Sequence, residues 1–288
     1  MTISLTDTQT QAQPTWCPGC GDFRILLGIK KALVAMGKPL HASCIISGIG
    51  CSGKLNHYVN TYGFESLHGR TQPVMTGVHL ANHKLNVVAV GGDGDGYGIG
   101  LGHLMHTMRR NMNMMYIVHD NQIYGLTTGQ YSPTTRQGTK TASSPFGSLE
   151  TPVNPVKLAL ASDGISFIAR GFAGDVDHLY KLIQAGMEHE GFALIDVLQP
   201  CTTFNKINTY DFYKERVYKL EEDASFDKTN KDLAMKRSEE WGERIPIGIF
   251  YQANLPLYEA SLPAIQDKAL VEHDINNINI TGLYKEFI

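Results

Sequence analysis

Short apolar runs alternate with amphipathic stretches along most of the chain. Apolar runs typical of buried strands occur at residues 41–47, 86–90, 114–119, 167–169 and 193–198. Apolar side chains at helical spacing occur at residues 24–36, 101–108 and 176–188. Strands that alternate with helices predict an α/β fold with a mostly parallel sheet and helices on both faces.

The two ends of the chain differ from this pattern. Residues 1–14 are polar, and we expect a flexible N-terminal arm there. From residue 211 to residue 244 about half of the side chains are charged, which is typical of a solvated helical extension or of a partner-binding tail. We therefore divide the chain into this arm, a ligand-binding domain over residues 15–205, and a charged C-terminal extension over residues 206–288 that forms a subunit interface.

Composition narrows the classes of partner. The chain has 288 residues and a formal net charge of -3, which argues against a nucleic-acid backbone or an anionic membrane as the main partner. No apolar run approaches the roughly 20 residues that span a bilayer, and the first residues lack the regions of a signal peptide. We expect a cytoplasmic protein that binds neither nucleic acid nor membrane.

A glycine-rich turn follows the strand predicted at residues 86–90. The run Gly91-Gly-Asp-Gly-Asp-Gly96 fits neither the dinucleotide fingerprint nor a Walker A loop. Asp93 stands in this turn, and Asp120-Asn121 follows the next predicted strand. Because the carboxyl ends of parallel strands meet in one crevice, these oxygen donors can complete a Mg²⁺ shell together with phosphate oxygens. The alternative is a glycine-rich turn and an Asx-turn with no ligand.

The chain has five cysteines, an odd number that does not favour a disulfide framework in a protein without an export signal. Cys17 and Cys20 alone fit a redox dithiol, half of a zinc site or part of an iron–sulfur cluster. Cys51 and Cys201 lie in loops near predicted strand ends, where the four thiols can converge on a [4Fe–4S] cluster. Cys44 lies inside an apolar run and is expected to be a core thiol.

These motifs together resemble a known family. Gly92-Asp-Gly94, followed 26 residues later by Asp120-Asn121, resembles the thiamine-diphosphate motif, with Asp120 in place of its usual first Asn. The segments at residues 16–22, 47–54, 67–70, 124–130 and 132–135 are similar to the β subunits of 2-oxoacid:ferredoxin oxidoreductases. The resemblance covers roughly residues 15–250, and the segment at residues 61–70 together with Asn154-Pro155 is most similar to the 2-oxoglutarate branch. One departure is the run at residues 127–130, which reads Thr-Thr-Gly-Gln.

The resemblance implies a thiamine-diphosphate-binding fold and a set of site residues. It implies that Asp93 and Asn121 bind Mg²⁺ by their side chains and Ile123 by its carbonyl, and that Cys17, Cys20, Cys51 and Cys201 bind a [4Fe–4S] cluster. The residues expected to contact the cofactor are Ile49, Gly50, Ser52, His68, Gly92, Asp93, Gly94, Asp95, Asn121, Leu126 and Thr127. The candidate catalytic residues are Lys54, His68 and Arg70, of which Lys54 would neutralise a substrate carboxylate unless it is simply an exposed helix-start lysine.

The implied reaction converts a 2-oxoacid, coenzyme A and oxidised ferredoxin into acyl-CoA, CO₂ and reduced ferredoxin, or runs in reverse. Thiamine also needs an activating glutamate, normally on a second domain that this chain has no room for. We therefore expect an α subunit to supply it in an αβ or α2β2 enzyme. The alternatives are a pyruvate or branched-chain 2-oxoacid enzyme, a non-catalytic iron–sulfur electron-transfer or scaffold protein, and a zinc-binding interaction module.

Overall fold

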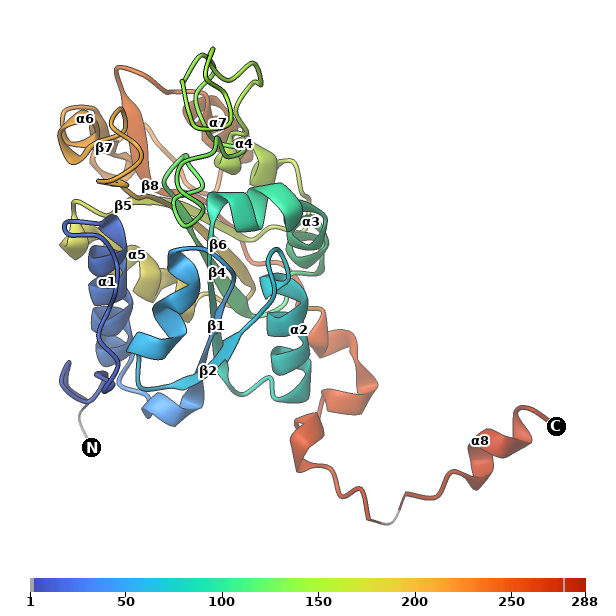
Figure 1. Cartoon of the computed structure of the whole chain (residues 1–288). Helices are drawn as coiled ribbons and strands as arrows, with labels where there is room; N and C mark the ends of the chain where they lie inside the picture. The colour runs from blue at the N-terminus through green and yellow to red at the C-terminus, as the bar shows by residue number, and fades with distance from the viewer. Residues whose placement is uncertain (1–2, 277) are drawn as a thin grey trace.

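A computed structural model describes residues 3–276 and 278–288, and within them eight strands form one sheet (Figure 1). The strand order is β2-β1-β3-β4-β6-β5-β8-β7. The strands are β1 (Ser43–Ser47), β2 (Tyr62–Glu65), β3 (Asn86–Gly92), β4 (Met114–Asp120), β5 (Phe167–Phe172), β6 (Phe192–Leu198), β7 (Val217–Lys219) and β8 (Ile245–Gln252). Neighbouring strands are parallel except for β5 and β8, so the sheet is mostly parallel, as predicted.

Helices cover both faces of this sheet. They are α1 (Gly21–Met36), α2 (Thr71–Ala81), α3 (Leu101–Arg110), α4 (Pro155–Leu160), α5 (Val176–Glu188), α6 (Tyr210–Lys214), α7 (Lys231–Ser238) and α8 (Thr281–Lys285). Alternate residues of a strand point to opposite faces, and Val88 of β3 accordingly packs with α1 and α5, whereas Val87 packs with α2, α3 and α4. Two hydrophobic cores result, one on each side of the sheet.

The predicted elements agree closely with the structure where the hydrophobic pattern is strong. The segments at residues 86–90, 101–108, 114–119, 176–188 and 193–198 are confirmed as β3, α3, β4, α5 and β6. The helix predicted at residues 24–36 begins earlier, at Gly21. The strand predicted at residues 41–47 begins later, at Ser43, because Leu40–Ala42 forms a 3₁₀ turn.

The parallel arrangement brings four loops to one edge of the sheet. The loops that follow β1, β3, β4 and β6 all leave from the carboxyl ends of neighbouring strands. The start of α1 is tied to the same edge, because the Gly21 N–H donates to the Pro200 carbonyl at 3.1 Å. The glycine-rich turn and the cysteine-bearing loops therefore lie near one another.

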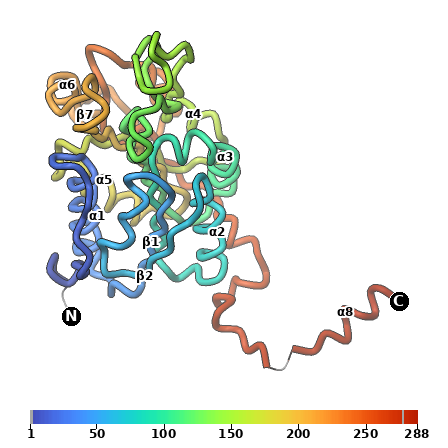
Figure 2. The backbone as a smooth tube through the Cα atoms, in the orientation of Figure 1, coloured from blue at the N-terminus to red at the C-terminus, as the bar shows by residue number. Residues whose placement is uncertain are grey.

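The C-terminal segment leaves this edge and runs to the opposite one. After β8, the chain is fixed near the amino ends of the strands by a His79–Glu259 contact of 2.7 Å and a Lys84–Glu272 contact of 2.6 Å. The last helix, α8, stands clear of the body, as the tube in Figure 2 shows. Among the residues that the structure describes, no helix has the length and apolar character needed to cross a bilayer.

Candidate functional site

A cavity of about 480 Å³ opens at the carboxyl ends of β1, β3 and β4. This volume is within the range of about 300–1,000 Å³ that small-molecule sites have in proteins. The eleven residues expected to contact the cofactor all line it, together with Ile123: Ile49, Gly50, Ser52, His68, Gly92, Asp93, Gly94, Asp95, Asn121, Leu126 and Thr127. We call this space the cofactor cavity.

Asp93, directly after β3, is a buried acid of the cavity whose side-chain partners are both hydroxyls. It is 2% exposed, and its Oδ2 accepts hydrogen bonds from Ser132 Oγ and, at 2.6 Å, from Thr134 Oγ1. Burial raises the pKa of the Asp93 carboxyl to about 6, although both hydroxyl hydrogen bonds work in the opposite direction. A buried carboxylate of this kind is stabilised by a bound cation.

Asp120 shares a hydroxyl partner with Asp93. Thr134 Oγ1 lies 2.7 Å from Asp120 Oδ1 as well as 2.6 Å from Asp93 Oδ2. Burial, followed by the charges of Asp196 and Asp93, raises the pKa of Asp120 well above its ordinary value. Burial thus favours the protonated form of Asp120, in which the side chain can donate as well as accept a hydrogen bond, as an asparagine side chain can.

A tight turn after β4 presents the other two candidate Mg²⁺ ligands. Asn121 is 8% exposed, and its Oδ1 accepts the Ile123 N–H at 3.1 Å. The Asn205 amide donates to the Asn121 carbonyl at 2.9 Å, and Gln122 has a positive φ of 58°. Together with Asp93, this turn offers a carboxylate, an amide oxygen and a main-chain carbonyl, which are the hard donors that Mg²⁺ prefers.

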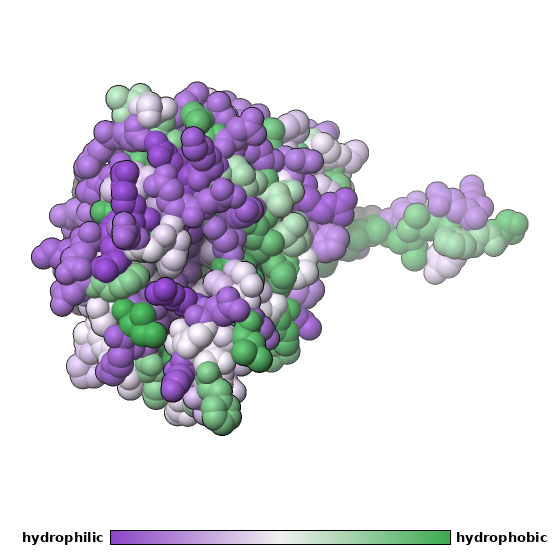
Figure 3. Space-filling view, turned by 90° about the horizontal axis from the view of Figure 1, so that it is seen from above, coloured by the Kyte–Doolittle hydropathy of each residue, from purple (hydrophilic) through white to green (hydrophobic). Residues whose placement is uncertain are grey.

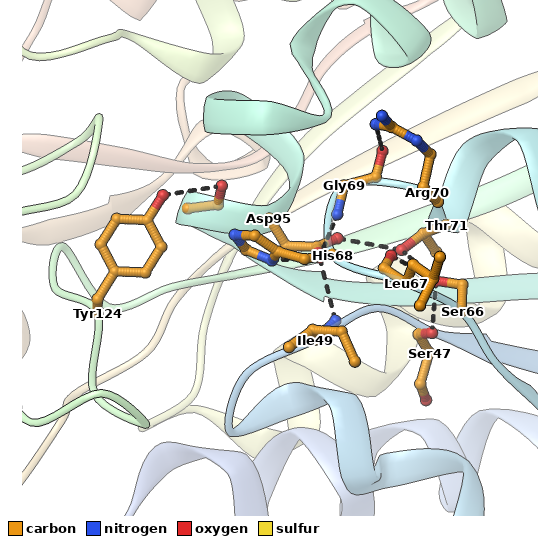
Figure 4. Close-up of polar contacts among 11 residues, drawn as sticks. Ser47, Ile49, Ser66, Leu67, His68, Gly69, Arg70, Thr71, Asp95 and Tyr124 are labelled. Carbon is orange, nitrogen blue, oxygen red and sulfur yellow. Dashed lines mark hydrogen bonds and ion pairs between the residues drawn. The ribbon is translucent and has the colours of Figure 1, made fainter.

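Asp95 joins the loops that form one wall of the cavity (Figure 4). Its Oδ1 accepts hydrogen bonds from the Ile49 N–H at 3.0 Å and the Gly69 N–H at 2.8 Å, and lies 3.0 Å from His68 Nδ1. Its Oδ2 accepts from Thr71 Oγ1 at 3.0 Å. Both oxygens are thus used inside the chain, so Asp95 positions the loops after β1 and β2.

Two features of the wall fit an anionic cofactor that is held closely. Gly94 is enclosed so tightly that a Cβ there would lie 2.1 Å from the Tyr124 ring, and only glycine allows this approach. Ser52 Oγ and His119 Nε2 are buried without a hydrogen-bond partner among the described residues, and both residues line the cavity. A bound diphosphate would supply such partners, so the cavity fits thiamine diphosphate.

A second cavity, of about 240 Å³, adjoins the first and is lined by Cys17, Cys20, Cys51 and Cys201. Both cavities share Cys51, Asn121, Gly125 and Leu126 in their walls. Cys44 lies apart, within β1, and its side chain belongs to the core. Four thiols around one space fit a cluster of several atoms, whereas no three His, Cys, Asp or Glu side chains in the described part of the chain lie close enough to hold one metal ion.

Two of the four thiols, those of Cys20 and Cys51, lie in surroundings that disfavour the thiolate. Burial, with the Asp22 carboxylate next, raises the pKa of Cys51 to about 12, and the same two causes raise the pKa of Cys20 further. Gln199 Nε2 donates to Cys20 Sγ at 3.1 Å, and Trp16 Nε1 donates to the Cys51 carbonyl at 2.6 Å. Metal binding would therefore have to displace protons from these thiols.

The fold separates the three candidate catalytic residues. His68 lines the cofactor cavity, with its ring 6.2 Å from that of Tyr124. Lys54 lines the cysteine cavity instead, and its Nζ donates to Thr15 Oγ1 at 3.3 Å. Arg70 is exposed and lines neither cavity, and its guanidinium donates to the Gly69 carbonyl.

Several side chains that lie at the site have no role predicted from the sequence. Ser132 and Thr134 hold Asp93, and His119 Nδ1 lies 2.6 Å from Asp22 Oδ1 in the cavity wall. The hydroxyl-rich run at residues 132–135 is the sequence signal for the first pair. His119 and Asp22 carry no local signal, because they are 97 residues apart and meet only in the folded sheet.

Comparisons with known proteins agree with this fold. Residues 48–197 match the family described as "Thiamine pyrophosphate enzyme, C-terminal TPP binding domain". Residues 201–267 match the family of the C-terminal region of the pyruvate ferredoxin oxidoreductase beta chain.

Known proteins are similar to this chain over most of its length. A 2-oxoacid:ferredoxin oxidoreductase subunit beta from Sulfolobus is 47% identical over 90% of this chain and 91% of its own. The 2-oxoglutarate synthase subunit KorB of Archaeoglobus fulgidus is 39% identical over 72% of this chain and 77% of its own. A solved 2-oxoglutarate:ferredoxin oxidoreductase from Magnetococcus marinus, with 2-oxoglutarate, coenzyme A and succinyl-CoA bound, is 37% identical with a TM-score of 0.91, covering 99% of this chain and 96% of that chain.

Proposed function

Because this chain belongs to the β subunits of the 2-oxoacid:ferredoxin oxidoreductases, we propose that its substrate is 2-oxoglutarate. The reaction is the oxidative decarboxylation of this acid with coenzyme A and ferredoxin, or the reverse reductive carboxylation. The similarity to the 2-oxoglutarate synthase subunit and to the 2-oxoglutarate-bound enzyme supports this choice over pyruvate and branched-chain acids. The chain is an oxidoreductase subunit rather than an electron-transfer scaffold, because it contains a thiamine enzyme domain.

The observation that carries the mechanism is the shared wall between the two cavities. Thiamine diphosphate, when bound, would supply a nucleophilic carbon and an electron sink for decarboxylation of the 2-oxoacid, and an iron–sulfur cluster would accept electrons one at a time. In our proposal Asp93, Asn121 and the Ile123 carbonyl hold Mg²⁺ in the cofactor cavity. The cluster would be held by the four cysteines of the adjoining cavity, which shares a wall with the cofactor cavity.

The other candidate site residues would have different roles, according to whether they lie inside the cofactor cavity, at its mouth or outside it. His68 Nδ1 is engaged by Asp95, which leaves Nε2 to exchange a hydrogen bond with substrate in the cavity. Leu126 and Thr127 are exposed at its mouth, where they would contact the cofactor. Lys54 and Arg70 are exposed cations outside it, and we propose that they bind substrate carboxylates once a partner chain closes the site.

The acids of the cavity support the need for an α subunit. Within the described residues its wall contains Asp22, Asp93 and Asp95 and no glutamate. Each of the three aspartates already has a partner inside the chain. The activating glutamate of thiamine would therefore come from the α subunit, in an αβ or α2β2 assembly that delivers electrons to ferredoxin.

Substrate choice is tested with the complex of this chain and its α subunit, purified without oxygen. The measurement is kcat/KM for ferredoxin reduction with 2-oxoglutarate, pyruvate and 2-oxoisovalerate at saturating coenzyme A. We expect 2-oxoglutarate to be preferred by at least about tenfold. A site that pairs its cations with the second carboxylate of 2-oxoglutarate would leave these cations unpaired when pyruvate or 2-oxoisovalerate binds. Equal or faster turnover of pyruvate would contradict the proposal.

A further inference from the structure

A third, smaller pocket lies beside the end of β4, and two arginines, Arg136 and Arg170, are in its lining. We call it the arginine pocket. No residue of its lining is shared with the cofactor cavity or with the cysteine cavity. Its volume of about 230 Å³ is below the range of about 300–1,000 Å³ that sites for larger ligands have. The pocket therefore suits a small ion better than a cofactor.

Arg170, in β5, is a buried cation whose hydrogen-bonding capacity is only partly used. Its side chain is 1% exposed, and its Nε donates to Asp196 Oδ2 at 3.1 Å. Its Nη1 is buried and has no hydrogen-bond partner among the described residues. Because buried polar groups in native proteins are almost always paired, an unpaired guanidinium nitrogen in the lining of a pocket indicates a ligand that accepts hydrogen bonds.

The charges around the pocket favour an anion as this ligand. Asp196 balances the charge of Arg170, but the exposed Arg136 guanidinium has no ion pair or hydrogen bond within the described residues. Asp120 is the one acid of the described lining, and it already accepts hydrogen bonds from the Thr134 hydroxyl and the Gln122 N–H. The positive charge of Arg136 is thus left for a ligand.

A free ion can approach this part of the molecule through a polar surface. The loop at residues 136–150, which begins with Arg136, stands at the top of the molecule in Figure 1. Figure 3 looks down on this face, where hydrophilic residues predominate. Trp241 lines the pocket with its side chain 42% exposed, and its ring centroid lies 5.5 Å from Arg170 Cζ. An occupant of the pocket would therefore change the surroundings of the Trp241 ring.

We propose that the arginine pocket binds a small oxyanion between Arg170 Nη1 and the Arg136 guanidinium. Phosphate and carboxylate groups both present the pairs of oxygens that a guanidinium matches, so they share the chemistry that this site recognises. Thr134 lines the pocket and also holds Asp93, so one side chain links the anion site to the proposed metal site. This inference goes beyond the proposed function, and it would stand if the substrate proved to be another 2-oxoacid.

The test is a ¹⁹F NMR titration of the αβ complex, assembled from an unlabelled α subunit and a β chain that contains 5-fluorotryptophan. The β chain has two tryptophans, and Trp241→Phe identifies the signal of Trp241 by its loss. Inorganic phosphate and succinate are each exchanged for chloride at constant ionic strength, which separates a specific site from charge screening. We expect the Trp241 signal to shift with a dissociation constant of about 1 mM or below for at least one anion. The anion that binds more tightly identifies the source of the oxyanion.

Variants of the two arginines show whether the shift comes from this pocket. Arg136→Gln removes an exposed side chain, so the fold is kept, and it should raise the dissociation constant at least about tenfold. Arg170→Lys keeps a charge beside Asp196 but lacks Nη1, and it should weaken binding in the same way. The matched control is Arg110→Gln, at an exposed arginine of α3 outside the pocket, and it should leave the titration unchanged.

Three results would overturn the proposal. The first is a Trp241 signal that neither anion shifts, and the second is an Arg136→Gln variant that binds as tightly as the wild type. The third is a shift that occurs in the β chain alone but is absent from the αβ complex, because a partner chain rather than a free anion would then occupy the pocket.

Discussion

A buried carboxylate in a protein interior requires a partner that offsets the loss of water, and the side-chain partners of Asp93 are two hydroxyls. Serine and threonine donate one proton each but carry no charge, so they orient Asp93 without neutralising it. The same threonine also reaches Asp120, whose pKa is raised well above its ordinary value by burial and by the neighbouring acids. The Asp93 carboxylate is thus held in a fixed orientation in the cavity wall, as a Mg²⁺ ligand requires.

Replacement of Asp93 tests the metal site. Asp93→Ala should abolish retention of thiamine diphosphate and turnover, because it removes the one charged ligand, while the iron content stays unchanged. Cofactor and iron are measured on the desalted αβ complex, with Asp211→Ala, in the exposed C-terminal region, as the matched control. A variant that keeps both cofactor and turnover would show that Asp93 is not a ligand.

Thr134→Val gives a graded version of the same test. Valine has nearly the shape of threonine but cannot form a hydrogen bond with Asp93 or Asp120. We expect Mg²⁺ affinity to fall about 10- to 100-fold, as is usual when a partner of a metal ligand is lost. The measurement is calorimetric titration of Mg²⁺ with thiamine diphosphate present, and unchanged affinity would refute a positioning role for Thr134.

The five cysteines differ in position, and the cluster assignment depends on that difference. We expect about four iron and four sulfide per chain after anaerobic purification. Serine at Cys17, Cys20, Cys51 or Cys201 should lower the iron content, whereas Cys44→Ser should keep it, since Cys44 is a core residue of β1. The assignment would be disproved if the purified protein contained zinc in place of iron, or if the Cys44→Ser variant lost its iron.

At the scale of elements, the clearest agreement between sequence and structure lies in the central strands. β3 and β4 are buried on both faces, so their sequences are continuous apolar runs that no polar alternation obscures. β2 and β8 were not predicted. All four residues of β2 are exposed at the sheet edge, and β8 contains Pro246 and Gly248, residues that normally interrupt strands.

One contact between elements predicts a pH effect. Glu259 fixes the start of the C-terminal segment to α2. Burial alone would raise the pKa of the Glu259 carboxyl. The hydrogen bonds with His79 and from the Asn113 N–H outweigh this effect of burial, so the pKa is lowered. A lowered pKa in the folded state means that the contact stabilises the protein fully above about pH 4.5 and is lost as the pH falls through the folded-state value.

Hydrogen exchange of residues 255–272 measures this effect. After correction for intrinsic rates, exchange should rise roughly tenfold as the pH falls below about 4.5, because hydrogen bonds to a charged group contribute about 1.5–3 kcal/mol. Glu259→Gln should exchange faster at neutral pH and show no such rise. A wild-type profile that is flat with pH would argue against the anchor.

At the scale of the whole molecule, sequence motifs identified the residues around the cofactor cavity but not how they are held. The glycine turn and Asp120-Asn121 are local signals at strand ends, and a parallel sheet necessarily brings such ends together. The His119–Asp22 pair and the division of Lys54, His68 and Arg70 among different surfaces depend on the folding of distant segments. No local pattern of residues specifies these long-range relations.

The central claim is that this chain holds the cofactors of a 2-oxoglutarate oxidoreductase whose activating glutamate lies on another subunit. The most direct measurement is 2-oxoglutarate- and coenzyme A-dependent ferredoxin reduction by this chain alone, reconstituted with cluster, Mg²⁺ and thiamine diphosphate, beside the αβ complex. We predict that the isolated chain binds its cofactors but does not turn over, and that adding the α subunit restores activity. Turnover by the isolated chain comparable to that of the complex would show that the glutamate lies within these 288 residues, and would contradict the account.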